Sequence, residues 1–140
     1  MKTGMPRDRA RFEGGRVLIV DDEPAICRAL QIALGRAGME GSIAESGDAA
    51  LAKLRSEQFD VMICDLRMPD LRGDVLFELA SAIQPQLRHR TLFTTGDITD
   101  RAERLIDACK CPMLRKPFEL NDVVDTVRAM LPAAREESSA

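Results

Sequence analysis

Hydrophobic positions along this chain alternate between short uninterrupted runs and longer stripes in which every third or fourth residue is apolar. Five short segments are predicted β-strands, at residues 16–20, 41–45, 60–64, 90–94 and 112–115, and the first and third of them hold uninterrupted apolar runs. Uninterrupted runs of this length are typical of strands that are covered on both faces of a sheet. The stripes between the runs predict helices, because residues at that spacing share one face of a helix.

The predicted helices follow the strands in regular alternation, and we expect their apolar faces to pack in the core. These faces consist of Ile26, Leu30, Ala33, Leu34 and Ala37 in the first helix, of Leu76, Leu79, Ala80 and Ile83 in the third, of Ala102, Leu105, Ile106 and Cys109 in the fourth, and of Leu120, Val123, Val124, Val127 and Leu131 in the fifth. The second helix is shorter and covers residues 48–56. Five strand–helix units with tight connections predict an α/β fold, in which helices wind doubly around a five-stranded parallel sheet.

The composition is that of one globular domain with two polar ends. The chain has 140 residues, of which 45% are hydrophobic and 31% are charged. We expect residues 1–14 to be a flexible leader, 15–131 to be the domain, and 132–140 to be a flexible tail or the start of a linker. No apolar run approaches the roughly 20 residues of a membrane span. The net charge of −3 weighs against a basic surface that binds nucleic acid.

The four cysteines do not form a pattern typical of a metal or redox site. The only close pair is Cys109 and Cys111, and the chain has one histidine, His89. We therefore expect reduced, mostly buried thiols in a cytoplasmic protein.

Three acidic residues stand where predicted strands end. Asp21 and Asp22 follow the first strand, and Asp65 follows the third. Ligands of open α/β sheets bind outside the carboxyl ends of the strands, so we expect these carboxylates to share one crevice. Like charges held that close repel one another unless a cation joins them or one carboxyl group stays protonated. Carboxylates without histidine or cysteine beside them suit a hard ion, and the three acids therefore predict a Mg²⁺ site.

Two further strands end in polar side chains that suit the chemistry of a phosphoryl group. The fourth strand leads to Thr95, which precedes Gly96, and the fifth leads to Lys116, which precedes Pro117. A metal ion and a lysine can neutralise the oxygens of a phosphoryl group on a carboxylate, and a hydroxyl can bind one of those oxygens. Thr94 is an alternative to Thr95, but alternation along the strand turns it to the other face.

Four motifs occur in an order and at a spacing that resemble those of a known family. They are Val-Asp-Asp-Glu at 20–23, Asp-Leu-Arg-Met-Pro-Asp-Leu-Arg-Gly at 65–73, Thr-Gly at 95–96 and Lys-Pro-Phe at 116–118. Over about residues 15–131, the chain resembles the receiver domains of bacterial two-component response regulators. The resemblance implies a flavodoxin-like (βα)5 fold with the strand order 2-1-3-4-5.

The resemblance also implies roles for the residues around the predicted metal site. Asp65 would be the phosphoacceptor and a ligand of Mg²⁺. Asp22 would bind Mg²⁺ directly, and Asp21 would bind it through water. The backbone carbonyl of Arg67 would complete the set of protein ligands.

The same resemblance implies a switch and a set of partners. Lys116 would pair with Asp65 and then with its phosphoryl oxygen, and Thr95 would be the switch hydroxyl. The phosphoryl donor would be a sensor histidine kinase or a histidine phosphotransfer domain, and a homodimer could form through the fourth helix, the fifth strand and the fifth helix. Such a domain is not an enzyme in the ordinary sense, because it catalyses only its own phosphorylation and dephosphorylation. No direct contact with nucleic acid or membrane is implied.

One position departs from the family pattern. Many receivers carry an aromatic residue three places before the lysine, whereas this chain carries Met113 and contains no Tyr or Trp. The sequence leaves open whether Met113 replaces that aromatic switch. Residues 111–118, Cys-Pro-Met-Leu-Arg-Lys-Pro-Phe, are similar to receivers fused to the C-terminus of hybrid sensor kinases.

Other functions fit part of the pattern. A Mg²⁺-dependent phosphohydrolase of the haloacid-dehalogenase type has two aspartates one residue apart after the first strand, whereas Asp21 and Asp22 are adjacent and the best nucleophile, Asp65, follows the third. Such an enzyme also needs a cap domain over its substrate, and we expect no room for one in this sequence. A receiver-like interaction module that is never phosphorylated would not need the complete set of acids, threonine and lysine. Nucleotide binding fits least, because the chain has no G-x-G-x-x-G or P-loop pattern.

Overall fold

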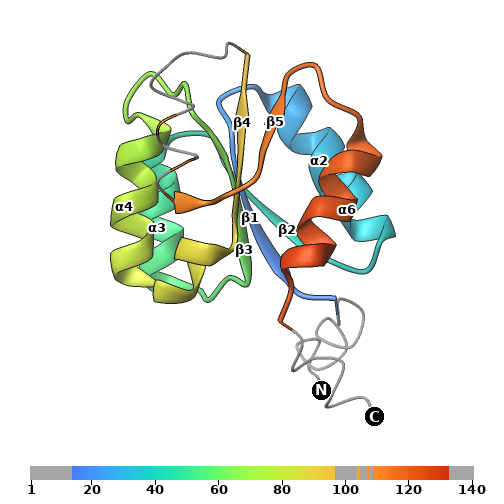
Figure 1. Ribbon diagram of the computed structural model, residues 1–140, viewed down its shortest axis with the longest axis horizontal. Coiled ribbons are helices and arrows are strands. Elements are labelled where there is room, and N and C mark those ends of the chain that lie inside the picture. Colours follow the sequence, from blue (N-terminus) through green and yellow to red (C-terminus); the bar gives the residue numbers. More distant parts are fainter. Residues whose placement is uncertain (1–13, 97–103, 105–106, 108, 133–140) are drawn as a thin grey trace, which may run out of the picture.

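The computed structural model describes residues 14–96, 104, 107 and 109–132. Its elements, in chain order, are β1 (Arg16–Val20), α2 (Pro24–Arg36), β2 (Glu40–Ala44), α3 (Gly47–Ser56), β3 (Val61–Asp65), α4 (Gly73–Ile83), the 3₁₀ helix η1 (Pro85–His89), β4 (Thr91–Thr95), β5 (Met113–Arg115) and α6 (Leu120–Met130) (Figure 1). None of the described helices is long and apolar enough to cross a membrane. The fourth predicted helix falls mostly outside the described residues, which include only Cys109 of its apolar face.

The five strands form one parallel sheet in the order β2-β1-β3-β4-β5. This order confirms the predicted doubly wound, flavodoxin-like fold. β1 and β3 are neighbours at the centre of the sheet, and Val20 is in register with Cys64. The residues that come next on the two strands are Asp21 and Asp65, so the register alone puts the two acids side by side.

Helices cover both faces of the sheet, and each face has its own hydrophobic core. α3 and α4 lie on one side, and α2 and α6 lie on the other (Figure 1). Alternation along β1 shows the division, since Leu18 and Val20 belong to the α3/α4 side and Val17 and Ile19 to the α2/α6 side. All four side chains are fully buried, which explains why the strand is an uninterrupted apolar run in the sequence.

The first predicted strand is confirmed, whereas the other four predicted ranges are each displaced by one residue at one or both ends. The displacement matters most in β3. Asp60 lies just outside this strand, where its carboxylate accepts the backbone N–H of Arg16 at 2.9 Å and its own N–H donates to the Arg16 carbonyl at 2.8 Å. Asp65 lies inside it because the sheet pairs Asp65 with Thr94, and the next N–H, of Leu66, donates to the Thr94 carbonyl at 2.9 Å. Asp65 is therefore the last residue of β3 and not the first residue after it.

The predicted apolar face of α4 is wrong in half of its members. Leu76 and Ala80 are buried, but Leu79 and Ile83 are 42% and 37% exposed. Phe77 takes their place in the core, where its ring packs edge-to-face on a phenylalanine of β4 at a centroid distance of 5.4 Å. This contact turns the helix so that Leu79 and Ile83 lie on its flank.

Gly14, the last residue of the predicted leader, is the first residue that the structure describes. The N–H of Gly14 donates to the carbonyl of Gly38 at 2.9 Å, beside the start of β1. Residues 1–13 and 133–140 lie outside the described residues, so the predicted leader and tail stay predictions.

Candidate functional site

The acidic end of β1 is built by the turn into α2. The N–H of Asp21 donates to the carbonyl of Ala44 on β2 at 3.2 Å, which carries the strand one residue further. The Asp21 carboxylate accepts the N–H of Glu23 at 2.9 Å, and Pro24 then begins the helix. Asp21 is buried as a result, whereas Asp22 and Glu23 are exposed.

Asp65 is buried at the end of β3, with only 3% of its surface exposed. One of its oxygens, Oδ1, accepts the backbone N–H of Arg67 at 3.0 Å. The loop then turns back so closely that a Cβ on Gly73 would lie 2.5 Å from the Asp65 carbonyl oxygen. The loop is thus shaped by a position where only glycine fits, and it places a backbone N–H against the carboxylate.

The same loop is tied to α3. The Asp70 carboxylate accepts the N–H groups of Gly47 and Asp48, the first two residues of that helix, at 3.0 and 3.1 Å. These hydrogen bonds hold the pKa of Asp70 below its usual value. In the sequence Asp70 stands out only as a member of the motif at 65–73, because nothing local links it to a helix that precedes it in the chain.

Lys116 crosses from the end of β5 to the acids of β1 and β3. Its ammonium nitrogen lies 3.0 Å from Asp21 Oδ2, 2.9 Å from Glu23 Oε1 and 3.1 Å from Asp65 Oδ2. Burial alone would lower the pKa of Lys116, but its hydrogen bonds to the three carboxylates outweigh burial and raise that pKa above its usual range. The lysine is therefore a fixed cation at neutral pH.

The cluster holds more negative charge than one lysine can balance. Ligand oxygens of Asp21, Asp22, Glu23 and Asp65 all lie within 4.8 Å of one another. Burial raises the pKa of Asp21, and hydrogen bonds from the Glu23 N–H and from Lys116 only partly offset that effect. Crowded oxygen ligands with a surplus of negative charge are the donor set that a hard divalent cation prefers, so the cluster can hold a metal ion.

Thr95 lies at the same edge as the last residue of β4, and it is buried. Its carbonyl accepts the backbone N–H of Lys116 at 2.7 Å, which ties the ends of β4 and β5 together. Thr94 is the partner of Asp65 in the register between β3 and β4. The Thr94 hydroxyl is buried and has no hydrogen-bond partner among the residues that the structure describes.

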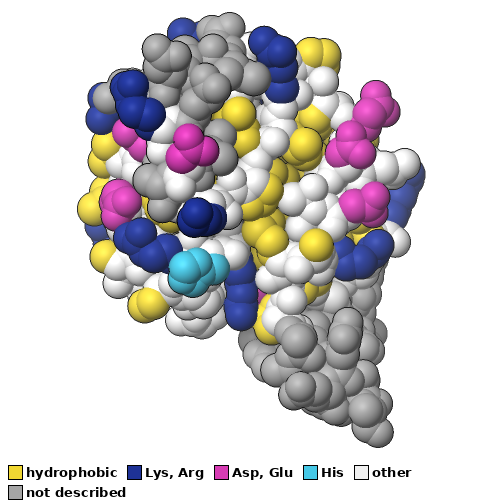
Figure 2. Space-filling model, in the orientation of Figure 1, with side chains coloured by type: hydrophobic (Ala, Val, Ile, Leu, Met, Phe, Trp, Pro, Cys, Tyr) yellow, Lys and Arg dark blue, Asp and Glu magenta, His cyan; other side chains and the backbone are white. Residues whose placement is uncertain are grey.

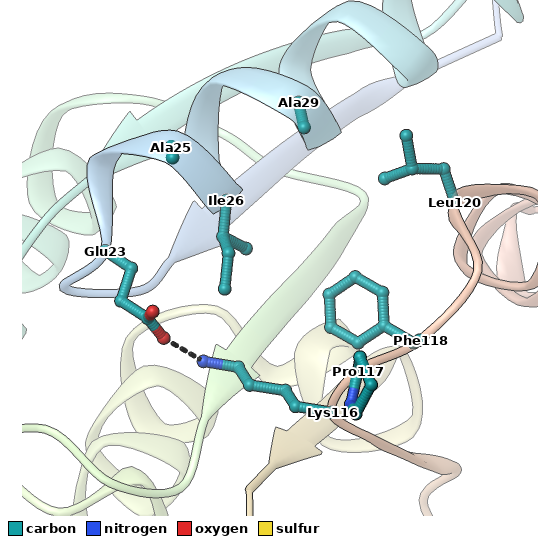
Figure 3. Close-up of a pocket in the computed structure, with 8 residues that line it drawn as sticks. All are labelled: Glu23, Ala25, Ile26, Ala29, Lys116, Pro117, Phe118 and Leu120. Carbon is teal, nitrogen blue, oxygen red and sulfur yellow. Dashed lines mark hydrogen bonds and ion pairs between the residues drawn. The ribbon is translucent and has the colours of Figure 1, made fainter.

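An apolar groove of about 460 Å³ opens beside the cluster (Figure 3). It lies between the first turns of α2 and the segment that leads from β5 into α6. Glu23 and Lys116 meet at one end of the groove, and the remaining lining residues are Ala25, Ile26, Ala29, Pro117, Phe118 and Leu120. The groove therefore shares Glu23 with the acidic cluster and also includes Lys116, the partner of that cluster.

Glu23 is the member of this site that sequence reasoning missed. It belongs to the motif at 20–23, but no role was assigned to it. Its partner, Lys116, is 93 residues away in the sequence. The available signal was its position, since Glu23 follows two strand-end acids and directly precedes Pro24 at the mouth of the predicted crevice.

The fold and site together define a class of protein: a doubly wound sheet with acids at the carboxyl ends of its two central strands and a lysine from its last strand. The sequence pattern of the family described as "Response regulator receiver domain" matches residues 17–128. The chain belongs to this family.

Individual relatives agree with the family match. The response regulator receiver protein CpdR of Brucella abortus is 32% identical over 120 residues, which cover 85% of this chain and 98% of CpdR. The probable transcriptional regulatory protein TcrX of Mycobacterium tuberculosis is 35% identical over 124 residues, which cover 88% of this chain but 52% of TcrX. The chain thus spans about half the length of such regulators.

A solved structure supports the same fold. The CheY-like response regulator receiver domain protein of Methanospirillum hungatei superposes with a TM-score of 0.78 at 27% identity, over 88% of this chain and 97% of that one. A receiver-class fold is therefore shown by both sequence and structure.

Proposed function

We propose that Asp65 accepts a phosphoryl group from a phosphohistidine of a sensor histidine kinase or a histidine phosphotransfer domain. The observation that carries this proposal is the contact between Lys116 and Asp65, 3.1 Å long, within a cluster of four carboxylates. A buried carboxylate beside a fixed ammonium suits a nucleophile whose product bears more negative charge than the free group. Membership of the receiver family favours this reading over a phosphohydrolase.

The proposed transfer takes place at the carboxylate of Asp65. One carboxylate oxygen forms a bond to phosphorus while the bond from phosphorus to the histidine nitrogen breaks, and the imidazole leaves. Lys116 and the N–H of Arg67 already contact the carboxylate, at 3.1 and 3.0 Å, so both donors lie where the phosphoryl oxygens would arrive. Thr95, at the end of the neighbouring strand, would bind another of these oxygens.

The metal that fits the cluster is Mg²⁺. Asp22 and Asp65 would bind it directly, Asp21 would bind it through water, and the backbone carbonyl of Arg67 would complete the protein ligands. When bound, Mg²⁺ neutralises charge on the transferring phosphoryl group. Water later attacks the phosphorus of the acyl phosphate, the bond to Asp65 breaks, and inorganic phosphate leaves. The protein therefore turns over no separate metabolite.

The phosphorylated state would differ at the surface around β5. The proposed output surface consists of the helix predicted over 102–109, β5 and α6, and it could serve a homodimer or another partner in the cytoplasm. Figure 2 shows hydrophobic side chains gathered in a band beside α6, with charged side chains to either side. Met113 lies in β5 in register with Phe93 and packs in the α3/α4 core, where a flexible apolar side chain can adapt to two arrangements.

The proposal is tested by incubating the protein with phosphoramidate and Mg²⁺ and measuring the intact mass. The wild type should gain one phosphoryl group, whereas Asp65→Asn should gain none. Asp70→Asn is the matched control, since it changes an acid five residues along the same loop and should leave the gain intact. Mapping of the phosphoryl group to Asp21, Asp22 or Asp70 in the wild type would show that the assignment of Asp65 is wrong.

A further inference from the structure

The ammonium of Lys116 has no hydrogen left for a phosphoryl oxygen. A lysine ammonium has three N–H donors. In the structure it has three carboxylate partners, on Asp21, Glu23 and Asp65, at 2.9 to 3.1 Å. A phosphoryl oxygen can therefore bind Lys116 only when one of the three carboxylates gives up its place.

The three carboxylates differ in what that exchange would cost. The side chains of Asp21 and Asp65 are 3% and 4% exposed, whereas that of Glu23 is 58% exposed. Removing the cation from Asp21 would leave a buried carboxylate without its partner, which is expensive. Asp65 is the group that carries the new phosphoryl oxygens. Glu23 can turn into water, because an exposed ion pair is held only weakly.

We infer that Glu23 is a positioning residue that occupies the third donor of Lys116 until an incoming phosphoryl oxygen displaces it, an inference that rests on the function proposed for Asp65. Figure 3 shows Glu23 reaching from the start of α2 to the tip of the extended Lys116 side chain. Glu23 keeps the lysine extended along the edge of the sheet in the resting protein. Its displacement then becomes part of the free energy of the transfer step.

The test measures the rate of phosphorylation by phosphoramidate over a range of donor concentrations, with saturating Mg²⁺. In this reaction an Asp65 oxygen bonds to phosphorus, the phosphorus–nitrogen bond breaks, and the nitrogen leaves as ammonia. Glu23→Gln should raise the maximal rate about two- to fivefold, the range expected for release of a partly exposed ion pair, and leave the half-saturating concentration unchanged. Glu119→Gln removes an exposed acid near the same groove that has no side-chain cap hydrogen bond, and it should change neither quantity.

The two kinetic quantities separate a contact with Lys116 from a general effect of charge. If Glu23 acted only by repelling the anionic donor, Glu23→Gln would lower the half-saturating concentration and leave the maximal rate unchanged, which would overturn the inference. A maximal rate equal to that of the wild type would overturn it as well.

A second variant shows whether Glu23 acts through the lysine. In a Lys116→Ala background, Glu23→Gln should have no further effect on the residual rate, and a persistent effect would contradict the inference. In the metal-free protein, nitrogen-15 NMR should show the Lys116 ammonium protons exchanging faster with water in Glu23→Gln than in the wild type. If the wild type gains no phosphoryl group on Asp65, the proposed function fails. If it does and Glu23→Gln behaves like the wild type, only this inference fails.

Discussion

Thr94 and Thr95 are neighbours in the chain, but the structure gives their hydroxyls different surroundings. The Thr94 hydroxyl is buried without a partner among the described residues, so it carries a desolvation cost with no hydrogen bond in return. We expect Thr94→Val to raise the free energy of unfolding by about 1 kcal/mol, because valine has nearly the same shape and no polar atom. Urea denaturation followed by circular dichroism measures this change.

Thr95→Val should behave differently, because the proposed role of this hydroxyl is in the phosphorylated state. The variant should still gain a phosphoryl group on Asp65. The change in amide hydrogen exchange that phosphorylation causes in β5 and α6 should become smaller. If the exchange changes are equal in Thr95→Val and the wild type, Thr95 is not the switch residue. Loss of these changes in Thr94→Val would contradict the assignment as well.

Asp21 is the acid whose burial costs stability. A carboxyl group with a raised pKa binds its proton more tightly in the folded state, so it destabilises the fold once the pH exceeds its usual value of 3.8, and the full cost applies above the raised pKa. Asp21→Asn should therefore raise Tm by a few degrees at pH 7, as expected for a change of about 1 kcal/mol. This gain should disappear as the pH falls through the raised pKa of Asp21 toward 3.8. A lower Tm at pH 7 would mean that the ion pair with Lys116 outweighs the cost of burial.

Single residues could be assigned to the site from the sequence only where a strand end pointed to them. Asp21, Asp22, Asp65 and Lys116 each stand at the end of a predicted strand, and the structure brings them together. Glu23 carries no such mark, because its importance depends on the length and direction of a lysine side chain 93 residues later.

At the scale of elements, the turn from β3 into α4 depends on one close approach. A Cβ on Gly73 would lie 2.5 Å from the Asp65 carbonyl oxygen and 2.7 Å from the Leu66 Cα, and backbone atoms cannot yield as a side chain can. Gly73→Ala should lower the free energy of unfolding by about 1–3 kcal/mol, the usual cost of overpacking. It should also slow phosphorylation, because the loop that holds Asp65 must shift.

Gly35 is the matched control for this change. It lies in α2, and no atom would come within 4 Å of an added Cβ. Gly35→Ala should raise the free energy of unfolding by roughly 0.5–1 kcal/mol, because alanine favours the helix. Equal losses in both variants, measured by thermal unfolding, would show that the contact at Gly73 is not what limits substitution there.

Periodicity predicted the type of the described strands and α-helices and their order along the chain, because the strands are buried on both faces and the helices on one. It could not predict which residues end a strand, since the pairing of Asp65 with Thr94 is decided by another strand. It also misassigned Leu79, because the contact between Phe77 and Phe93 sets the rotation of α4. Both errors come from tertiary contacts that no local pattern contains.

At the scale of the whole molecule, binding of a metal ion to the acidic cluster would be linked to folding. Mg²⁺ that binds the folded state and relieves repulsion in the cluster should stabilise the protein, by about 1.4 kcal/mol at ten times its Kd. Asp22→Asn should weaken Mg²⁺ binding strongly in calorimetric titrations, since it removes one of few ligands. For the stabilisation by Mg²⁺, the control is NaCl at matched ionic strength. An equal rise in Tm with NaCl would indicate general screening of charge in place of a specific site.

β5 is a strand of three residues at the edge of the sheet, and Lys116 follows it directly. The lysine spans the carboxyl edge from β5 to Asp65 on β3 and to Asp21 beyond β1. In mechanical terms, this side chain is a strut between the edge of the sheet and its centre. If Lys116 exchanges a carboxylate for a phosphoryl oxygen, as proposed, the stiffness between β5 and β1 would change. Because α6 begins only four residues after Lys116, such a change would reach the helix through a very short segment of chain.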